Sequence, residues 1–532
     1  MKDRLSGAPK IVTCASPISR PLTLFTALRG AGGKRSPVSN LPAHDIGRLA
    51  LQGGTAKFAG QALNFLLRLL YIVTVARLLT PADFGLVTMV VAITGIYELF
   101  ATGGLSTAAI QTVAITEEQI STLFWINVLI GIGLTLLCMM TAPLLVSFYH
   151  EPRLFWVTIA LSPSFLFSAL GAQHSAILQR QLRYIALTTI ETLATLCGIV
   201  TAIILAVKGF GYWALVASAV ISPAVTTASM WAAVGWVPGR PRSNTSIQSM
   251  LHFGGTITLN SLVSYATYNL DKLLLGRFWG ADKLGIYGRA NQIIMLPTTQ
   301  IHGAMLGIAL SVLSRLQNDP ARFRRFFLSA YSLVISVTAP MTIFSACFAE
   351  DIVLVVLGPQ WWEAAPVFRF LAPTVLIFGI INPTSWLVLA LGLQKRSLAI
   401  ALVIAPLCVT AYFIGLPWGP SGVALCYSTA MTLWLFPHII WAVRGTPISP
   451  SDYFHATWPP IISALIAGMA ALLVRHYLSA ALLPLWSLVL EGCAMTLVHV
   501  TTLLFVMGQK DLYTKIFSIL KPNAGESRVV DA

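Results

Sequence analysis

The chain has 532 residues, of which 56% are hydrophobic and only 10% are charged, and its mean hydropathy is +0.78. Soluble domains carry about a quarter charged residues, so this composition excludes an ordinary soluble protein. The formal net charge of +15 fits either nucleic acid or a membrane surface, and the positions of the basic residues decide between the two.

The first 49 residues are rich in Gly, Pro, Ser and basic side chains and contain no continuous apolar core. They predict a disordered basic arm and no signal peptide. Beyond this arm the chain carries apolar runs long enough to cross about 30 Å of hydrocarbon, which takes about twenty helical residues. Fourteen such runs are predicted, near 55–77, 82–102, 118–147, 153–177, 184–207, 211–235, 248–275, 283–313, 322–348, 364–391, 396–416, 419–443, 456–474 and 483–507.

Lys and Arg residues between the runs predict which side of the membrane each connection faces. With the N-terminus in the cytoplasm, the arm, the C-terminal tail and the inner connections carry most of them, as the positive-inside rule requires. The basic charge is therefore a topology signal and not a nucleic-acid footprint, and both termini are expected in the cytoplasm. The basic residues expected on the outer side are Arg77, Arg153, Lys208, Arg277, Lys283 and Arg475.

Two segments, RLLTPADFGLV at 77–87 and RFWGADKLGIY at 277–287, repeat a pattern of Arg, an acidic patch and Gly at the ninth position. Farther along, Pro163 aligns with Pro373 and Gly209 with Gly419 at a slightly larger spacing. These ordered matches predict an internal duplication. Six runs separate equivalent points, so the two halves have the same orientation, as in transporters that carry substrate between parallel repeats.

The runs and the repeat together predict how the chain is divided. Each half forms a six-helix lobe, and two further helices follow the second lobe. The predicted parts are the arm at 1–49, the first lobe at 50–235, a cytoplasmic linker at 236–247, the second lobe at 248–443, the last two helices at 444–507 and a cytoplasmic tail at 508–532.

Several motifs resemble one bacterial family over most of the chain. They are ARLLTPADFGLVTM with GGLSTAAIQ (103–111), DKLLLGRFWGADKLGIYGRANQIIMLP (271–297), SRLQNDPARFRR (314–325) and LGPQWWEAAPVFRFLAP (357–373). The chain resembles polysaccharide and lipopolysaccharide repeat-unit flippases, in the colanic-acid-exporter-like branch of the multidrug/oligosaccharidyl-lipid/polysaccharide exporter superfamily.

The resemblance implies an all-α integral membrane protein with two six-helix lobes facing each other in a V, plus two peripheral C-terminal helices. It implies that the protein flips undecaprenyl-diphosphate-linked oligosaccharide across the bacterial inner membrane by alternating access, for exopolysaccharide or lipopolysaccharide synthesis. The partners it implies are the lipid-linked oligosaccharide, membrane lipids and, beyond these, a polysaccharide polymerase and export machinery.

Charged residues inside the runs are the candidates for the site, because a charge in hydrocarbon costs several kcal/mol unless it faces a cavity or a partner. Arg68 lies near the middle of the first run, and Asn64 lies one turn earlier on the same helical face. A guanidinium binds phosphate through two parallel hydrogen bonds, so Arg68 is the first candidate for binding the diphosphate. The alternative is a structural salt bridge to Glu98.

The run beginning near residue 248 supplies Asn269, Asp271 and Lys272, and the next run supplies Arg289 and Asn291. Asp271 and Lys272 are adjacent, so their side chains diverge by about 100° on a helix. Lys272, Asn269, Arg289 and Asn291 are expected to line the substrate cleft. Asp271 and Glu98 are candidates for a carboxylate that binds protons or sodium, and a permanent ion pair is the alternative for Asp271.

Four charged residues near the repeated segments are expected at the outer mouth. Arg77 with Asp83, and Arg277 with Asp282, form candidate ion pairs that gate this mouth. The alternative is that the arginines anchor the helices at the lipid headgroups. The Trp361–Trp362 pair is expected in the outer interfacial belt.

Two rival functions are weighed against the flippase. A membrane glycan polymerase or transferase lacks support, because the sequence has no Asp-x-Asp, no HExxH and no phosphate-binding glycine loop. An ion-coupled multidrug antiporter of the same superfamily shares the fold, but it needs mainly acidic residues in its cleft. The scattered cysteines and histidines have no metal-ligand spacing, so neither a metal nor a cofactor is expected.

Overall fold

The structure is a computed structural model that describes residues 43–102, 116–181, 183–241, 248–479 and 482–510. Side chains are described within these ranges except at 43–59, 248–260, 263 and 479. Most of the predicted arm at 1–49, half of the linker at 236–247 and most of the tail at 508–532 therefore lie outside the described residues. The described residues fold as helices and form two compact units, unit 1 (Met1–Gly288) and unit 2 (Arg289–Ala532).

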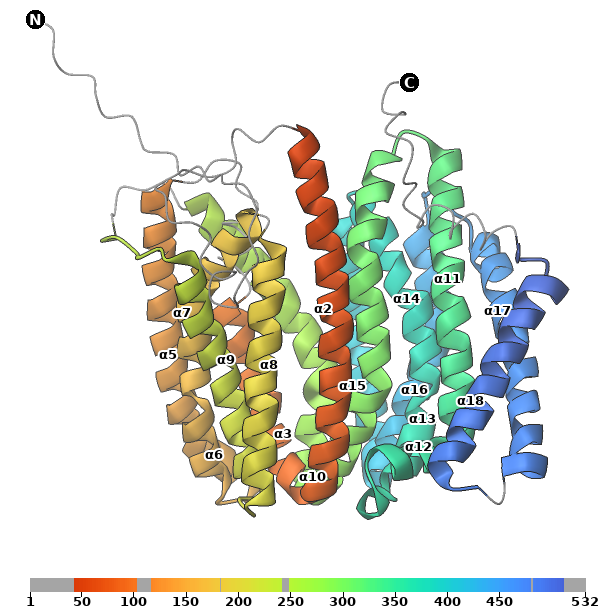
Figure 1. Ribbon diagram of the computed structural model, residues 1–532, viewed down its shortest axis with the longest axis horizontal. Coiled ribbons are helices and arrows are strands. Elements are labelled where there is room, and N and C mark those ends of the chain that lie inside the picture. The colour runs from red at the N-terminus through yellow and green to blue at the C-terminus, as the bar shows by residue number, and fades with distance from the viewer. Residues whose placement is uncertain (1–42, 103–115, 182, 242–247, 480–481, 511–532) are drawn as a thin grey trace, which may run out of the picture. The chain divides into compact units, whose positions relative to one another are not determined.

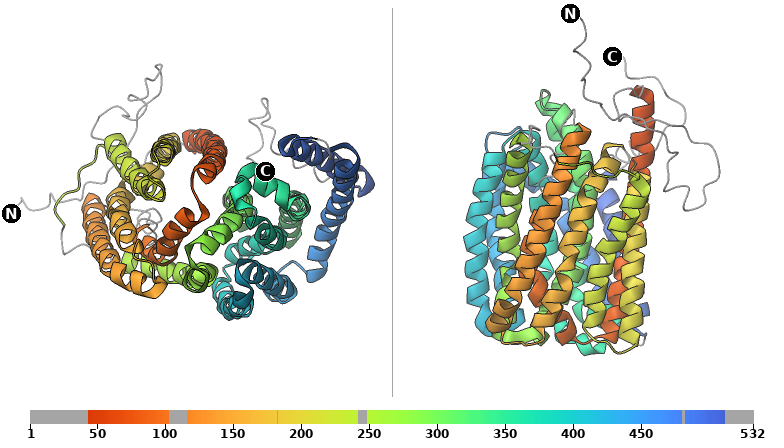
Figure 2. Two further views of the ribbon diagram at one scale, coloured as in Figure 1. Left: turned by 90° about the horizontal axis from the view of Figure 1, so that it is seen from below. Right: turned by 90° about the vertical axis from the view of Figure 1, so that its left-hand side faces the viewer.

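Unit 1 consists of long apolar helices that run alongside one another (Figure 1). Helices α8 and α9 pack together, as do α5 and α7 and also α2 and α8 (Figure 2). The helices are α2 (Ala43–Leu78), α3 (Pro81–Thr102), α5 (Glu117–Tyr149), α6 (Leu154–Leu161), α7 (Pro163–Arg180), α8 (Tyr184–Val207), α9 (Trp213–Val234) and the first part of α10 (Gln248–Arg315).

Unit 2 contains the second part of α10 and the remaining helices. Helix α11 packs against α14 and α17, and α15 packs against α16. The elements are α11 (Pro320–Cys347), α12 (Ala349–Val356), η1 (Pro359–Trp361), α13 (Ala364–Leu371), α14 (Pro373–Ala390), α15 (Gln394–Gly415), η2 (Leu416–Trp418), α16 (Gly419–Val443), α17 (Pro450–Val474), η3 (Arg475–Ser479), α18 (Pro484–Thr501) and η4 (Thr502–Val506).

Within the described residues, twelve helical segments are long and apolar enough to cross a membrane. Two of them, Ser264–Arg315 and Gln394–Val443, have 52 and 50 residues, more than twice the roughly twenty that one crossing needs. The first is interrupted at Gly280, where φ is 78°, and the second contains η2. The chain is a multi-pass membrane protein, and the count of fourteen stays a prediction.

The same pair of helices occurs once in each unit, which supports the predicted duplication. In unit 1, α6 has 8 residues and is followed after Ser162 by α7 with 18 residues. In unit 2, α13 has 8 residues and is followed after Ala372 by α14 with 18 residues. Pro163 and Pro373 each start the longer helix, and proline suits the first helical turn because its missing N–H has no helical partner there.

Two arginines at equivalent places cap the ends of neighbouring helices. In unit 1, Arg183 precedes α8 and donates from Nη1 to the Ala233 carbonyl near the end of α9, at 3.2 Å. In unit 2, Arg396 near the start of α15 donates from Nη1 to the carbonyls of Ala442 and Arg444 at the end of α16, at 3.1 and 2.6 Å. The last carbonyls of a helix lack intrahelical donors, so these arginines satisfy them with charged donors.

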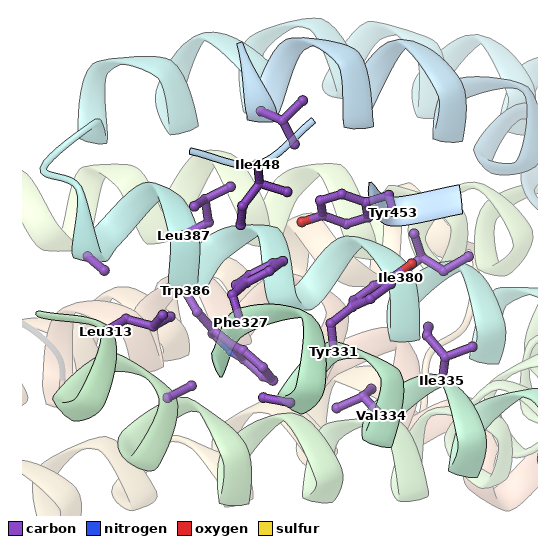
Figure 3. Packing of buried hydrophobic residues seen from close by; sticks show 14 of the residues in the cluster. Leu313, Phe327, Tyr331, Val334, Ile335, Ile380, Trp386, Leu387, Ile448 and Tyr453 are labelled. Carbon is purple, nitrogen blue, oxygen red and sulfur yellow. The ribbon is translucent and has the colours of Figure 1, made fainter. Parts of the chain in front are cut away.

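The core of unit 2 contains a group of aromatic side chains between α11 and α17 (Figure 3). The rings of Tyr331 and Tyr453 have centroids 4.7 Å apart, and Phe327 stacks on Tyr331 at 6.2 Å. The Tyr331 hydroxyl also lies 2.6 Å from Thr457 Oγ1. These contacts fix α17, the first helix beyond the predicted second lobe, to α11.

Helix α18 is joined to the same core by a buried histidine. Pro340 in α11 has no N–H, so the Ser336 carbonyl four residues earlier loses its helical donor. His499 Nε2 donates to this carbonyl at 2.9 Å, and its ring also lies 3.0 Å from Ser463 Oγ of α17. One imidazole therefore links three helices of unit 2.

The expectation that both Trp361 and Trp362 belong to an interfacial belt is wrong for the first of them. Trp361 is 0% exposed and belongs to the core, whereas Trp362 is 71% exposed. The turn of η1 separates the two rings, because consecutive residues of a 3₁₀ helix point about 120° apart. Composition alone did not distinguish these neighbours.

This pair predicts two very different mutational effects. Trp361→Ala should lower the free energy of unfolding by about 3–5 kcal/mol, because it removes a large ring from a packed core. Trp362→Ala should change it by less than about 0.5 kcal/mol. Thermal unfolding of the purified full chain in one detergent measures both. Equal shifts for the two variants would contradict the burial of Trp361.

Candidate functional site

Arg68 lies on the side of α2 that faces away from its exposed leucines. Leu63, Leu66 and Leu70 are exposed and form the apolar stripe that suits contact with lipid. At about 100° per residue, Arg68 is about 140–160° around the helix from these leucines. Its side chain is exposed, and it makes no hydrogen bond or ion pair with the described residues. The guanidinium is therefore available and is not on the leucine stripe.

Asn64 lies one turn before Arg68 and connects α2 to α8. Its amide Nδ2 donates to Thr192 Oγ1 at 3.2 Å. One turn earlier, Gly60 packs so closely on Thr188 that a Cβ at this position would overlap the Thr188 side chain. The two helices thus pack in register along this face, which places Arg68 beside α8 as well.

The polar residues of α10 in unit 1 form two separate groups, as the predicted divergence of Asp271 and Lys272 requires. Asp271 is only 3% exposed and accepts a hydrogen bond from the Tyr287 hydroxyl at 2.7 Å and another from the Lys272 N–H at 2.8 Å. Lys272 Nζ instead donates to Asn269 Oδ1 at 2.6 Å. Asp271 has no salt bridge with any described cation, so the alternative of a permanent ion pair finds no support.

Lys272 occupies the face of α10 that packs against α3. It lies within about 40° of Tyr265 and Gly276 around the helix. The Tyr265 hydroxyl donates to the Val91 carbonyl of α3 at 2.9 Å, and a Cβ at Gly276 would press on the Met89 side chain of α3 at 3.3 Å. The ammonium therefore lies near the boundary between these two helices.

The two repeated segments meet each other within unit 1. A Cβ at Gly85 of α3 would overlap the backbone carbonyl of Ala281, and a Cβ at Gly285 of α10 would overlap the backbone carbonyl of Pro81. Pro81 and Ala281 are equivalent in the repeat, so the contact is reciprocal. Helices cross this closely only where both lack side chains, which explains why each segment has glycine at its ninth position.

Glu98 and Asp83 form hydrogen bonds with residues other than Arg68 and Arg77, the partners predicted for them. Glu98 of α3 accepts a hydrogen bond from Ser168 Oγ of α7 at 3.3 Å and is half-buried. Asp83 accepts from the N–H and the hydroxyl of Thr80, at 3.0 and 2.7 Å, and from the N–H of Tyr212 at 3.1 Å. Asp83 thus fixes the start of α3 to the turn before α9, and its gating role stays a prediction.

Among the remaining residues of the predicted outer mouth, Arg277 contacts a histidine and an aromatic ring and not its predicted acidic partner. Arg277 Nη1 lies 2.8 Å from His150 Nδ1, and its guanidinium carbon is 5.7 Å from the centre of the Phe148 ring. Arg77 and Asp282 are exposed. No ion pair joins Arg277 to Asp282 within the described ranges.

The loop between α5 and α6 contains an exposed ion pair beside His150. Arg153 donates to both carboxylate oxygens of Glu151, at 2.8 and 3.0 Å. These bonds lower the pKa of Glu151 below its ordinary value. A lowered pKa means that the pair stabilises the fold above the ordinary range for glutamate and loses this contribution as the pH falls. Exposure keeps the contribution small.

Arg289 and Asn291 lie at the start of the portion of α10 that belongs to unit 2. Arg289 is largely buried and donates to Gln292 Oε1, one turn farther on. Asn291 is half-buried. Their predicted role in substrate binding stays a prediction.

Three residues that the sequence reasoning did not select are important in the described structure. Tyr287 holds Asp271, and its place in the GIYGRANQ motif was the available signal. Thr192 holds Asn64, and nothing in the sequence marks it among many threonines. Glu491 of α18 is fully buried and accepts from Ser487 at 2.8 Å; a carboxylate within the last apolar run was its signal.

Repeated helix pairs and apolar segments of membrane-spanning length, with ionisable side chains among them, define a multi-pass membrane protein. Similar solved structures include the lipid II flippase MurJ in an inward closed conformation, with a TM-score of 0.70 and 15% identity over 86% of this chain and 99% of that one. An inward-facing multidrug MATE transporter has a TM-score of 0.58 and 15% identity over 74% of this chain and 97% of that one.

The chain belongs to the family described as "Polysaccharide biosynthesis protein", whose profile matches residues 74–366. It is 28% identical to the teichuronic acid biosynthesis protein TuaB of Bacillus subtilis over 54% of this chain, and 26% identical to the lipopolysaccharide biosynthesis protein WzxC of Escherichia coli over 61%. It spans 60% and 66% of these relatives' lengths. The succinoglycan biosynthesis transport protein ExoT of Rhizobium meliloti is 23% identical over 78% of this chain and 84% of its own length.

Proposed function

We propose that the protein is a flippase that moves an undecaprenyl-diphosphate-linked oligosaccharide from the inner to the outer leaflet of the bacterial inner membrane. The observation that carries the proposal is Arg68, a guanidinium within an apolar helix, on the face opposite the lipid-suited leucines and without a partner among the described residues. Such a group is stable where it meets water or an anion. The relatives WzxC, a lipopolysaccharide biosynthesis protein, and ExoT, a succinoglycan biosynthesis transport protein, support the same substrate class.

The proposed transport cycle uses two six-helix lobes, at 50–235 and 248–443, that open alternately to the two sides. Arg68 binds the diphosphate, because its planar fork matches two phosphate oxygens. Asn64 lies on the same face of the same helix. Lys272, Asn269, Arg289 and Asn291 are assigned to the remaining diphosphate and glycan contacts.

Two buried or half-buried carboxylates are proposed to couple transport to the binding of protons or sodium ions. Asp271 is buried and makes no salt bridge with a cation of the described residues, so binding a proton or a sodium ion there would offset the cost of burying its charge. Glu98 is the second candidate. Arg77, Arg277, Asp83 and Asp282 are assigned to the outer mouth, and both termini to the cytoplasm. No covalent step is required, so the protein acts as a transporter and not as an enzyme, and a polymerase or export complex is the proposed recipient of its product.

Reconstitution of the full chain into liposomes tests the function. The liposomes contain a short undecaprenyl-diphosphate-linked oligosaccharide on both leaflets, and a membrane-impermeant glycosidase is added outside. In protein-free liposomes only the outer half of the glycan is cleaved, whereas the flippase should allow nearly all of it to be cleaved. Cleavage that stops at half, together with protein-dependent efflux of a hydrophobic cation, would replace the proposal with the antiporter.

A further inference from the structure

Three helices of unit 2 each contain an internal proline. Pro297 lies in α10, Pro340 in α11 and Pro383 in α14. Each lacks an N–H, so the carbonyl four residues earlier has no helical donor. His499 serves the carbonyl freed by Pro340. Pro383 frees the carbonyl of Gly379.

A small pocket lies among these three helices. Its polar lining is formed by Thr298 and His302 of α10, Thr338 of α11 and Asn382 and Trp386 of α14, and Gly379 lines it as well. The rings of His302 and Trp386 are nearly parallel, at 15°, with centroids 6.4 Å apart. The pocket has room for about one water molecule.

Three residues of this lining each have a buried polar atom with no hydrogen-bond partner in the described protein. The atoms are Thr298 Oγ1, His302 Nδ1 and Trp386 Nε1. Thr298 is 4% and Trp386 is 1% exposed. Buried polar atoms are almost always hydrogen-bonded, because leaving one unsatisfied costs about 1–3 kcal/mol. Three such atoms on one pocket indicate a shared ligand.

The lining defines the chemistry of this ligand. The indole N–H of Trp386 can only donate, whereas the threonine hydroxyl can donate or accept and the imidazole nitrogen does one or the other according to its tautomer. The ligand must therefore accept at least one hydrogen bond and be able to donate others. Among the described lining residues none is Asp, Glu, Lys or Arg, so an ion would be buried there without a countercharge. Size and neutrality together leave water.

We propose that this pocket is a binding site for one structural water molecule, which joins α10 to α14 near their internal prolines. The water accepts from Trp386 Nε1 and bonds Thr298 Oγ1 and His302 Nδ1. A buried water of this kind satisfies polar side-chain atoms that the protein leaves unpaired. The site lies within unit 2 and is independent of the proposed diphosphate contacts at Arg68.

The sign of one stability change tests the site. Thr298→Val keeps the side-chain shape and removes the hydroxyl. If the hydroxyl binds water, the thermal midpoint of the full chain should fall by about 2–4 °C. If the pocket is dry, the midpoint should rise, because the substitution removes an unsatisfied buried group. A rise or no change would overturn the proposal. Thr299→Val is the matched control, since Thr299 is exposed and donates to the Leu296 carbonyl of its own helix.

One further measurement covers the case in which Thr298→Val does not fold, and a second applies where it does fold. Hydroxyl radicals made from bound water by X-ray pulses should oxidise Trp386 of the unmodified chain faster than Trp361, which is equally buried but does not line the pocket. Equal rates would exclude the water. Where both variants fold, Thr298→Val and Trp386→Phe should be non-additive, because they share one ligand. Additive shifts of the thermal midpoint would mean that the two side chains do not share a ligand, and would overturn the proposal.

Discussion

Replacing Gly85 with alanine should stop polysaccharide export and destabilise the protein by at least about 1–3 kcal/mol, the range for overpacking a close contact. The added methyl would overlap the Ala281 carbonyl. Because this neighbour is backbone, no side-chain rotation relieves the overlap, and α3 or α10 has to shift. Gly285→Ala should have the same effect, since its methyl would meet the Pro81 carbonyl.

Gly288 provides a matched control on the same helix. A Cβ there would have Thr88 atoms at 3.7 and 3.8 Å, which is ordinary contact. Gly288→Ala should therefore be neutral or stabilise the protein by about 0.4–1 kcal/mol, because alanine restricts the unfolded chain. Thermal unfolding in detergent and surface polysaccharide in cells measure the three variants. If Gly85→Ala behaved like Gly288→Ala, the close crossing of the two repeated segments would be wrong.

Replacing Arg68 with alanine should reduce export about 10-fold to 100-fold while the protein still inserts into the membrane. Hydrogen bonds to charged groups contribute about 1.5–3 kcal/mol each, and a diphosphate would lose at least one of them. Arg68→Lys should retain part of the activity, because it keeps the charge but not the two parallel donors. Export is measured as surface polysaccharide, and insertion as the amount of protein in the membrane fraction.

Two controls distinguish binding from folding in the Arg68 series. Leu66→Ala changes the exposed stripe on the other side of α2, and Arg325→Ala removes an exposed arginine near the start of α11. Both should export normally. Normal export by Arg68→Ala would remove this residue from the proposed binding site and leave the function without its main support in the structure.

The sequence predicted features that depend on local pattern. Apolar length predicted a membrane protein, and the spacing of repeated motifs predicted a duplication that the equal helix lengths around Pro163 and Pro373 support. Adjacent positions on a helix predicted that Asp271 and Lys272 diverge. Each of these inferences needs only helix geometry and composition.

Features that depend on which helices meet were not predictable. The sequence does not tell which of two neighbouring tryptophans is buried, because the turn at η1 decides it. It does not tell that Asn64 meets Thr192, which is far along the chain. Nor does it tell that the two glycines of the repeated segments face each other, although it marked both. Tertiary contacts set all three.

Arg183 and Arg396 show that one set of charges serves two purposes. The predicted topology makes them cytoplasmic cations that orient the nascent chain, and as donors to Ala233 and Ala442 they close the ends of folded helices. Neutralising either residue to invert the topology would therefore also loosen a mature helix end. Membrane insertion and helix capping both depend on these two guanidinium groups. Fewer residue types should therefore be tolerated at positions 183 and 396 than membrane orientation alone would require.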